Sequence, residues 1–293
     1  MSRASLSGWL RHDGVELRRL ARWGAQRGPD AWLRWSPPAF GLAFAALLPS
    51  ARRAVRAQLR RVRGRQPALR EQLEVARTFA RFASCFAESL ALGGPRGREV
   101  SHEVEGAPNL DAALAAGRGL IVVTAHTAGW DAVGASLAAR VGREVVVVMQ
   151  KERDAAARDL HDEARARAGV RVVHVGDDPL AALPLLAHLR RGGVVALQLD
   201  RVLPGARTLA VRLFGEAAEL PAGPFLLAAA SGAPVLPVFA RRLGLLRYAV
   251  RVCPPVSVER GASPAVMGEA AGGAAAELER FVRAYPTHWF PFG

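Results

Sequence analysis

A histidine and an aspartate stand five positions apart in the segment GLIVVTAHTAGWD, residues 119–131. A carboxylate that is hydrogen-bonded to one imidazole nitrogen fixes the tautomer of the ring and raises the basicity of the other nitrogen. A histidine held in this way can take a proton from a hydroxyl group. His126 and Asp131 are therefore candidates for a general base and the residue that orients it.

The backbone between these two residues decides whether their side chains can meet. Positions i and i+5 of a regular helix lie about 140° apart, so the two side chains would diverge on one helix. We expect His126 on a turn and Asp131 in the first turn of the helix that follows, because Gly129 can take backbone angles that other residues avoid. A structural role fits equally well, with Asp131 as a helix-start acid and His126 hydrogen-bonded within the turn.

A buried strand must place the histidine. Residues 120–124, LIVVT, are apolar and rich in β-branched side chains, which predicts a strand buried on both faces. Open α/β sheets carry their reacting groups where such strands end. Similar apolar runs alternate with helical patterns downstream, which predicts an α/β fold with a mainly parallel central sheet flanked by helices. We expect further strands at 144–149, 171–175, 194–199, from about 235, and at 247–253, and helices at 153–168, 179–191, from about 221, and at 268–284.

Residues 1–95 differ from the rest of the chain, because they are basic, helical in pattern and hold four of the six tryptophans. Their apolar run at 39–48 is shorter than the ~20 residues that a membrane-spanning helix needs. We expect this N-terminal helical segment to lie at a membrane surface. An α/β catalytic domain is expected at 96–293, forming one continuous globular unit with it.

An arginine-dense helix is expected at 51–65, with Val55, Leu59 and Val62 on one face. This face either lies on a membrane, with the arginines against anionic headgroups, or packs on the protein core. The sequence leaves both interpretations open.

The net charge of +14 comes almost wholly from arginine, since Lys151 is the only lysine. Arginine prefers phosphate and carboxylate partners, so we expect an anionic surface as the partner. Nucleic acid is disfavoured, because the basic residues are scattered and lack the interleaved aromatic residues that stack on single strands. Cys85 and Cys253 form no C-x-x-C motif, so we expect neither a disulfide framework nor a metal site.

The sequence lacks several common catalytic motifs. It contains no G-x-S-x-G elbow, no Walker A sequence and no H-E-x-x-H, and the glycines before the strand at 120 do not complete a dinucleotide fingerprint. What remains is the histidine–aspartate pair, with arginines that can supply anion binding.

Four ordered blocks point to a known family. The first block is HTAGWD at 126–131, and the second is Arg165 four residues before Gly169. The third begins at Asp200-Arg201 and continues through LFG at 213–215, LPAGP at 220–224 and SGAPV at 231–235. The fourth is YPTHWF at 285–290. In these blocks the chain resembles the lysophospholipid acyltransferase superfamily, in the branch of the bacterial lipid A biosynthesis (lauroyl/myristoyl) acyltransferases. Phosphatidylinositol mannoside acyltransferases share that branch.

The resemblance implies a glycerol-phosphate-acyltransferase-like fold. It also implies transfer of a fatty acyl chain from acyl-carrier protein or acyl-CoA to a hydroxyl of a membrane lipid or glycolipid. The acceptor would resemble lipid A or a lysophospholipid. It implies that His126 is the general base, that Asp131 orients it, and that Arg165, Asp200 and Arg201 bind substrate. It implies no metal and no cofactor besides the donor. The expected partners are anionic membrane lipids and the thioester donor, and the expected state is a monomer attached peripherally to the cytoplasmic face of the inner membrane.

The sequence departs from the family pattern H-x-G-N-W-[DE] at Ala128 and Gly129. Arg165 could also form a solvated ion pair, and Asp200 could cap a turn. The alternative function is a non-catalytic, arginine-rich binder of anionic membrane or nucleic acid that keeps the fold. The intact pair of His126 and Asp131, together with Asp200, favours an enzyme.

Overall fold

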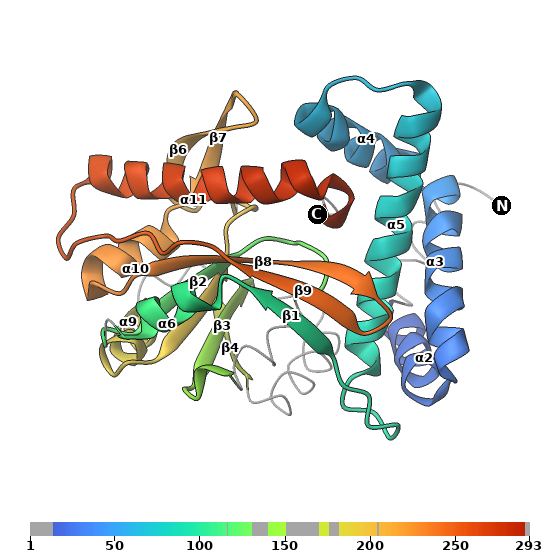
Figure 1. Ribbon diagram of the computed structural model, residues 1–293, viewed down its shortest axis with the longest axis horizontal. Coiled ribbons are helices and arrows are strands. Elements are labelled where there is room, and N and C mark those ends of the chain that lie inside the picture. Colours follow the sequence, from blue (N-terminus) through green and yellow to red (C-terminus); the bar gives the residue numbers. More distant parts are fainter. Residues whose placement is uncertain are drawn as a thin grey trace.

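A sheet occupies the centre of the computed structural model, which describes residues 14–115, 117–130, 140–150, 170–175, 182–203 and 205–290 (Figure 1). Within these residues, seven strands follow the order β1-β9-β8-β2-β5-β3-β4. Every neighbouring pair is parallel except β8 and β9, which form an antiparallel hairpin. The strands are β1 (Ser101–Glu105), β2 (Leu120–Thr124), β3 (Val145–Gln150), β4 (Val170–Val175), β5 (Val194–Gln198), β8 (Val235–Gly244) and β9 (Arg247–Val252).

The mainly parallel α/β sheet predicted from the sequence is confirmed, and the predicted strands agree with the observed ones to within one residue. Strand β1 and helix α6 (Ala107–Ala115) were not predicted, because β1 is short and mostly exposed and offers no apolar run. The predicted helix at 153–168 and the one that starts at Asp131 lie outside the described residues.

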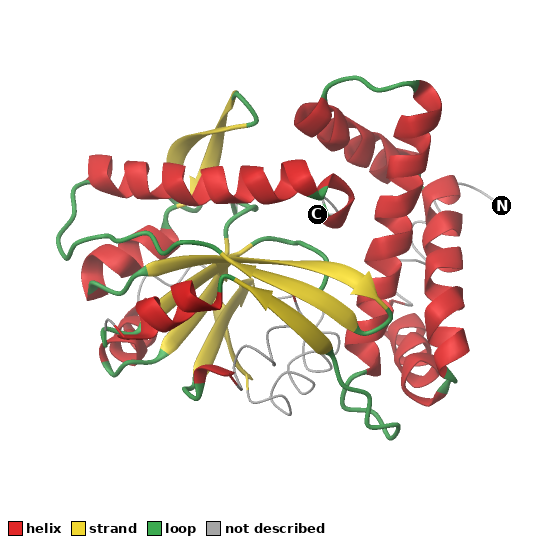
Figure 2. Ribbon diagram, viewed as in Figure 1, coloured by secondary structure: helices red, strands yellow, loops and turns green. Residues whose placement is uncertain are grey.

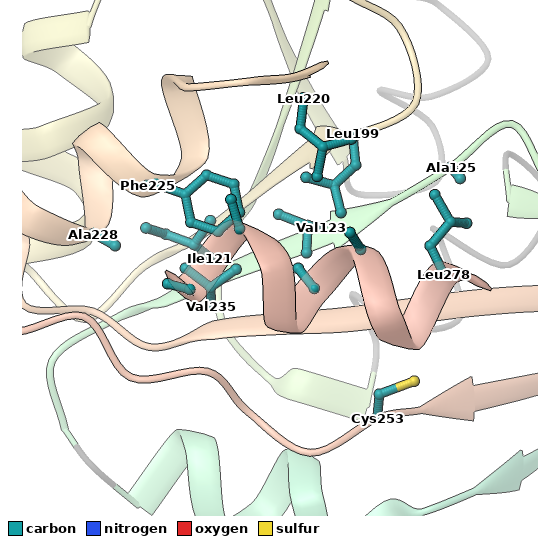
Figure 3. Close-up of a cluster of buried hydrophobic side chains, with 14 of the residues drawn as sticks. Ile121, Val123, Ala125, Leu199, Leu220, Phe225, Ala228, Val235, Cys253 and Leu278 are labelled. Atoms are coloured by element: carbon teal, nitrogen blue, oxygen red, sulfur yellow. The ribbon is translucent and has the colours of Figure 1, made fainter. Parts of the chain in front are cut away.

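Helices cover both faces of the sheet, and the side chains of β2 alternate between them. Leu120 and Val122 belong to a buried cluster that includes residues of α6. Ile121 and Val123 belong to a second cluster on the opposite face (Figure 3). That face is covered by α9 (Ala182–Arg190), α10 (Gly223–Ser231) and α11 (Pro264–Ala284), and Figure 2 shows α11 lying along it. Burial on both faces explains why β2 is continuously apolar.

A separate antiparallel hairpin packs on α11. It consists of β6 (Thr208–Leu213) and β7 (Glu216–Pro221), joined by Phe214 and Gly215. Both turn residues have positive φ, 56° and 84°, as a two-residue hairpin turn of this hand requires. The sequence did not predict this hairpin, because phenylalanine is not a usual residue for such a turn.

The N-terminal helices α2 (Gly14–Arg27), α3 (Asp30–Leu47), α4 (Pro49–Arg63) and α5 (Ala68–Ala91) stand together beside the sheet (Figure 1). Helices α3 and α5 pack closely, since a Cβ at Gly41 would overlap the backbone of Phe79. Within the described residues, no helix has the length and apolar character needed to span a bilayer.

The apolar face of α4 is buried inside the protein. Val55 and Leu59 pack with Val75 and Phe79, and Val62 belongs to the main core. Packing of Val55, Leu59 and Val62 on the core is therefore confirmed, and contact of the arginines of this helix with anionic headgroups stays a prediction. Several arginines of α4 pair with two glutamates of α5 that are themselves buried.

Candidate active site

His126 and Asp200 are brought together by the pairing of two parallel strands. Residues of β2 and β5 pair in register, with Thr124 opposite Gln198. His126 and Asp200 each follow two residues after these partners, so both lie at the same edge of the sheet, where parallel strands end. The ring nitrogen Nδ1 of His126 lies 2.9 Å from Oδ1 of Asp200.

The carboxylate of Asp200 is buried and accepts hydrogen bonds at both oxygens. Its Oδ2 accepts from the backbone N–H of His126 at 3.0 Å and from Nε1 of Trp289 at 2.8 Å. Its side chain is 3% exposed, against 16% for His126. Burial alone would raise the pKa of Asp200, but the hydrogen bonds from His126 and Trp289 outweigh it, so the pKa lies below the ordinary value.

This geometry defines the tautomer of His126. The ionised carboxylate of Asp200 can only accept hydrogen bonds, so Nδ1 carries the proton that joins the two residues. Nε2 is then the nitrogen with a free lone pair. An imidazole in this state can accept a proton from a hydroxyl group, and the nearby carboxylate stabilises the imidazolium that forms.

The segment after α11 fixes the loop that carries His126. The backbone N–H of Ala128 donates to the carbonyl of His288 at 2.8 Å, and the N–H of Phe290 donates to the carbonyl of His126 at 2.9 Å. On the other side of the loop, the hydroxyl of Thr127 accepts from the N–H of Ala240 at 3.2 Å. The histidine therefore stands on a loop held from two sides.

Tyr248 explains why glycine stands at position 129. Gly129 has φ of 89°, and a Cβ there would overlap the Tyr248 ring. The tyrosine hydroxyl donates to Glu88, a fully buried residue whose other oxygen accepts from Arg242 at 2.6 and 2.9 Å. The departure from the family pattern at this position thus reflects packing against β9.

The predicted site residues fall into two groups. His126 and Asp200 meet. Arg201 follows Asp200 in the sequence, and its Nη2 lies 3.4 Å from the carbonyl oxygen of Phe290. Asp131 and Arg165 lie outside the described residues, so their predicted roles stay predictions. Among the described residues, no group of three or more histidines, cysteines, aspartates and glutamates is arranged to hold a metal ion.

Sequence reasoning assigned no role to Trp289, although its segment was noted as a family block. An indole N–H offers a single hydrogen bond, and nothing in the spacing of the sequence connects position 289 to position 200. The signal that could have found it was the family block at 285–290, YPTHWF, whose tryptophan was left without a role.

A comparison with known protein families completes this picture. Residues 22–292 match the family described as bacterial lipid A biosynthesis acyltransferase. The chain belongs to this acyltransferase family. Both the sheet edge with His126 and Asp200 and the segment with Trp289 lie within the matched residues.

Two mycobacterial proteins are similar to this chain. A phosphatidylinositol mannoside acyltransferase of Mycobacterium tuberculosis is 32% identical over 142 residues, which cover 48% of this chain and 44% of that protein. One from Mycolicibacterium smegmatis is 28% identical over 240 residues, 80% of this chain and 76% of that protein. The match thus spans less than half the length of the first of these relatives.

Proposed function

We propose that this protein transfers a fatty acyl chain from a thioester donor, acyl-carrier protein or acyl-CoA, to a hydroxyl of a membrane lipid or glycolipid. The observation that supports it most is the hydrogen bond from Nδ1 of His126 to the buried carboxylate of Asp200. A protein that only binds an anionic surface has no use for a histidine oriented by a buried charge.

In this proposal, Nε2 of His126 takes the proton of the acceptor hydroxyl as the oxygen attacks the thioester carbonyl. A tetrahedral intermediate forms, and its collapse breaks the carbon–sulfur bond. The thiolate leaves and takes the proton back from the imidazolium, so that the products are an ester and a free thiol. The charge of Asp200 stabilises the imidazolium between the two proton transfers.

We infer that Asp200 is the positioning carboxylate of His126. Its three hydrogen bonds and its burial support this role. Asp131 was predicted to orient the same ring, and Arg165 and Arg201 to bind the polar end of the substrate. We keep these assignments as part of the proposal, and acyl-transfer rates of Asp131 and Asp200 variants distinguish the roles of the two aspartates.

The acceptor class follows from the similarity to phosphatidylinositol mannoside acyltransferases. We propose a membrane glycolipid or phospholipid acceptor, and action at the cytoplasmic face of the inner membrane, where a thioester donor is available. Residues 1–95 would supply the membrane-surface segment and residues 96–293 the catalytic domain.

Replacement of His126 by alanine tests the proposed chemistry. Loss of a positioned base is expected to lower the rate of acyl transfer by about 10²–10⁴-fold. The variant also takes one hydrogen bond from the buried carboxylate of Asp200, so we expect a lower melting temperature but a cooperative transition, and the rates are compared at a temperature where both proteins are folded. The assay measures transfer of a radiolabelled acyl chain to extracted membrane lipid. Wild-type turnover in this variant would contradict the proposal.

A further inference from the structure

An open basic hollow lies beside the candidate active site, between α4, the β6–β7 turn and the end of α11. It has a volume of about 480 Å³. Arg61, Arg63, Arg70 and Arg283 line it, with Phe214 in its wall. Gathering like charges around one space costs free energy unless an opposite charge compensates for it. The hollow therefore has the electrostatics of an anion site.

Glutamates around the hollow hold these guanidinium groups in place. Arg63 and Arg70 share the buried Glu74, at 3.1 and 3.6 Å. Arg61 and Arg283 each have a glutamate of their own, at 2.8 Å in both cases. Four positive charges thus meet three negative ones, and none of the three glutamates lines the hollow. Since each guanidinium has five N–H donors, donors are left over for a ligand.

Phe214 connects the hollow to the active site. The guanidinium carbons of Arg61 and Arg283 lie 5.9 and 5.5 Å from the centre of the Phe214 ring. The same ring lies 5.8 Å from that of Trp289, which donates to Asp200. Phe214 has φ of 56°, a conformation that costs free energy for a residue other than glycine. Two aromatic side chains therefore separate the hollow from the buried carboxylate.

We propose that this hollow binds the phosphate group of a substrate of the reaction. Guanidinium groups match phosphate oxygens with paired, charge-assisted hydrogen bonds, and arginine is the side chain best suited to this geometry. The identity of the substrate rests on the proposed function. Phosphate is present on the phosphopantetheine arm shared by acyl-CoA and acyl-carrier protein, and in the headgroup of a phospholipid acceptor.

The double variant Arg61→Gln/Arg70→Gln removes two charges from the hollow without leaving a buried charge unpaired. The partner of Arg61 is exposed, and Glu74 keeps its bond to Arg63 when Arg70 is replaced. The matched control is Arg190→Gln/Arg207→Gln, which removes the same charge from two exposed positions that do not line the hollow.

Equilibrium binding of soluble probes measures the effect without turnover. The donor arm compares 4′-phosphopantetheine with pantetheine, and the acceptor arm compares glycerophosphoinositol with inositol. We expect the wild-type protein and the control variant to bind one phosphorylated probe at least about tenfold more tightly than its phosphate-free form. The Arg61→Gln/Arg70→Gln variant should lose this preference, and the arm in which it is lost identifies the substrate.

The proposal is overturned if the wild-type protein prefers neither phosphorylated probe, or if the double variant keeps the preference of the control. The test also separates this site from the proposed chemistry. The His126→Ala variant should bind the probes as the wild type does. Phosphate binding that depends on Arg61 and Arg70, in a protein without acyl transfer, would contradict the proposed function and leave the phosphate site standing.

Discussion

Asp200 and Trp289 show how distant residues define the state of one histidine. Asp200 is buried beside an imidazole, and its pKa stays low because N–H groups of His126 and Trp289 donate to it. The local pattern around His126 could be predicted from the sequence, because it lies at the end of a continuous apolar strand. The sequence could not predict that Asp200 is the carboxylate bonded to Nδ1, because the two residues lie far apart in the chain and no spacing pattern links them.

Replacing Trp289 by phenylalanine removes one hydrogen bond from Asp200 and keeps an aromatic ring. The lost bond lowers the pKa of Asp200 in the wild type, so the variant has a higher Asp200 pKa. With one donor fewer, the carboxylate of Asp200 attracts more strongly the proton that the His126–Asp200 pair takes up, so the acid limb of the kcat/KM profile, which reports protonation of this pair, should move upward in pH. Stability should fall by about 1–3 kcal/mol, because a buried oxygen loses a donor.

Profiles of kcat/KM against pH, together with thermal melts, check this expectation. A residue that serves only packing would lower the melting temperature and leave the acid limb where it is. That result would remove Trp289 from the positioning of His126.

The buried strands of the sheet could be predicted from the sequence, whereas the β6–β7 hairpin and the packing partner of α4 could not. Strands β2, β3, β5 and β8 are buried and apolar over their length or first half, so periodicity and composition locate them. The β6–β7 hairpin escaped prediction because Phe214 takes a conformation that its residue type disfavours. The burial of the apolar face of α4 was one of two possibilities, since an amphipathic pattern does not say what covers it.

The molecule as a whole presents an aromatic surface on the side of its N-terminal helices. Trp23, Trp32, Trp35, Phe40 and Leu47, on α2 and α3, are all at least half exposed. Exposed tryptophans beside arginines suit the interface of an anionic bilayer. We infer peripheral attachment through this surface, in place of the apolar face of α4 that the sequence also allowed.

Attachment of this kind predicts weaker binding when Trp23, Trp32 and Trp35 are replaced by serine. Partition onto vesicles of phosphatidylglycerol and phosphatidylcholine should fall at least about tenfold, because each ring loses its burial in the interface. The control replaces Leu183, Leu226 and Val266, which are exposed on α9, α10 and α11. Equal losses in both triple variants, measured by co-sedimentation, would contradict attachment through α2 and α3.

The role of Asp200 is decided by comparing acyl-transfer rates of Asp200→Asn, Asp200→Glu and Asp131→Asn with the wild type. Asparagine keeps the size of Asp200 but removes the charge that stabilises the imidazolium. In a serine protease the same exchange lowers kcat by about 10⁴-fold, which is an upper guide here. Thermal melts of each variant show whether a loss of rate comes from unfolding.

We predict that Asp200→Asn loses at least about 100-fold in rate while still melting cooperatively, and that Asp200→Glu, which keeps a carboxylate, recovers part of it. A similar loss of acyl-transfer rate in Asp131→Asn would support the predicted role of Asp131 as well. A rate for Asp200→Asn within a few-fold of the wild type, with Asp131→Asn alone inactive, would contradict the assignment of Asp200 as the positioning residue of His126.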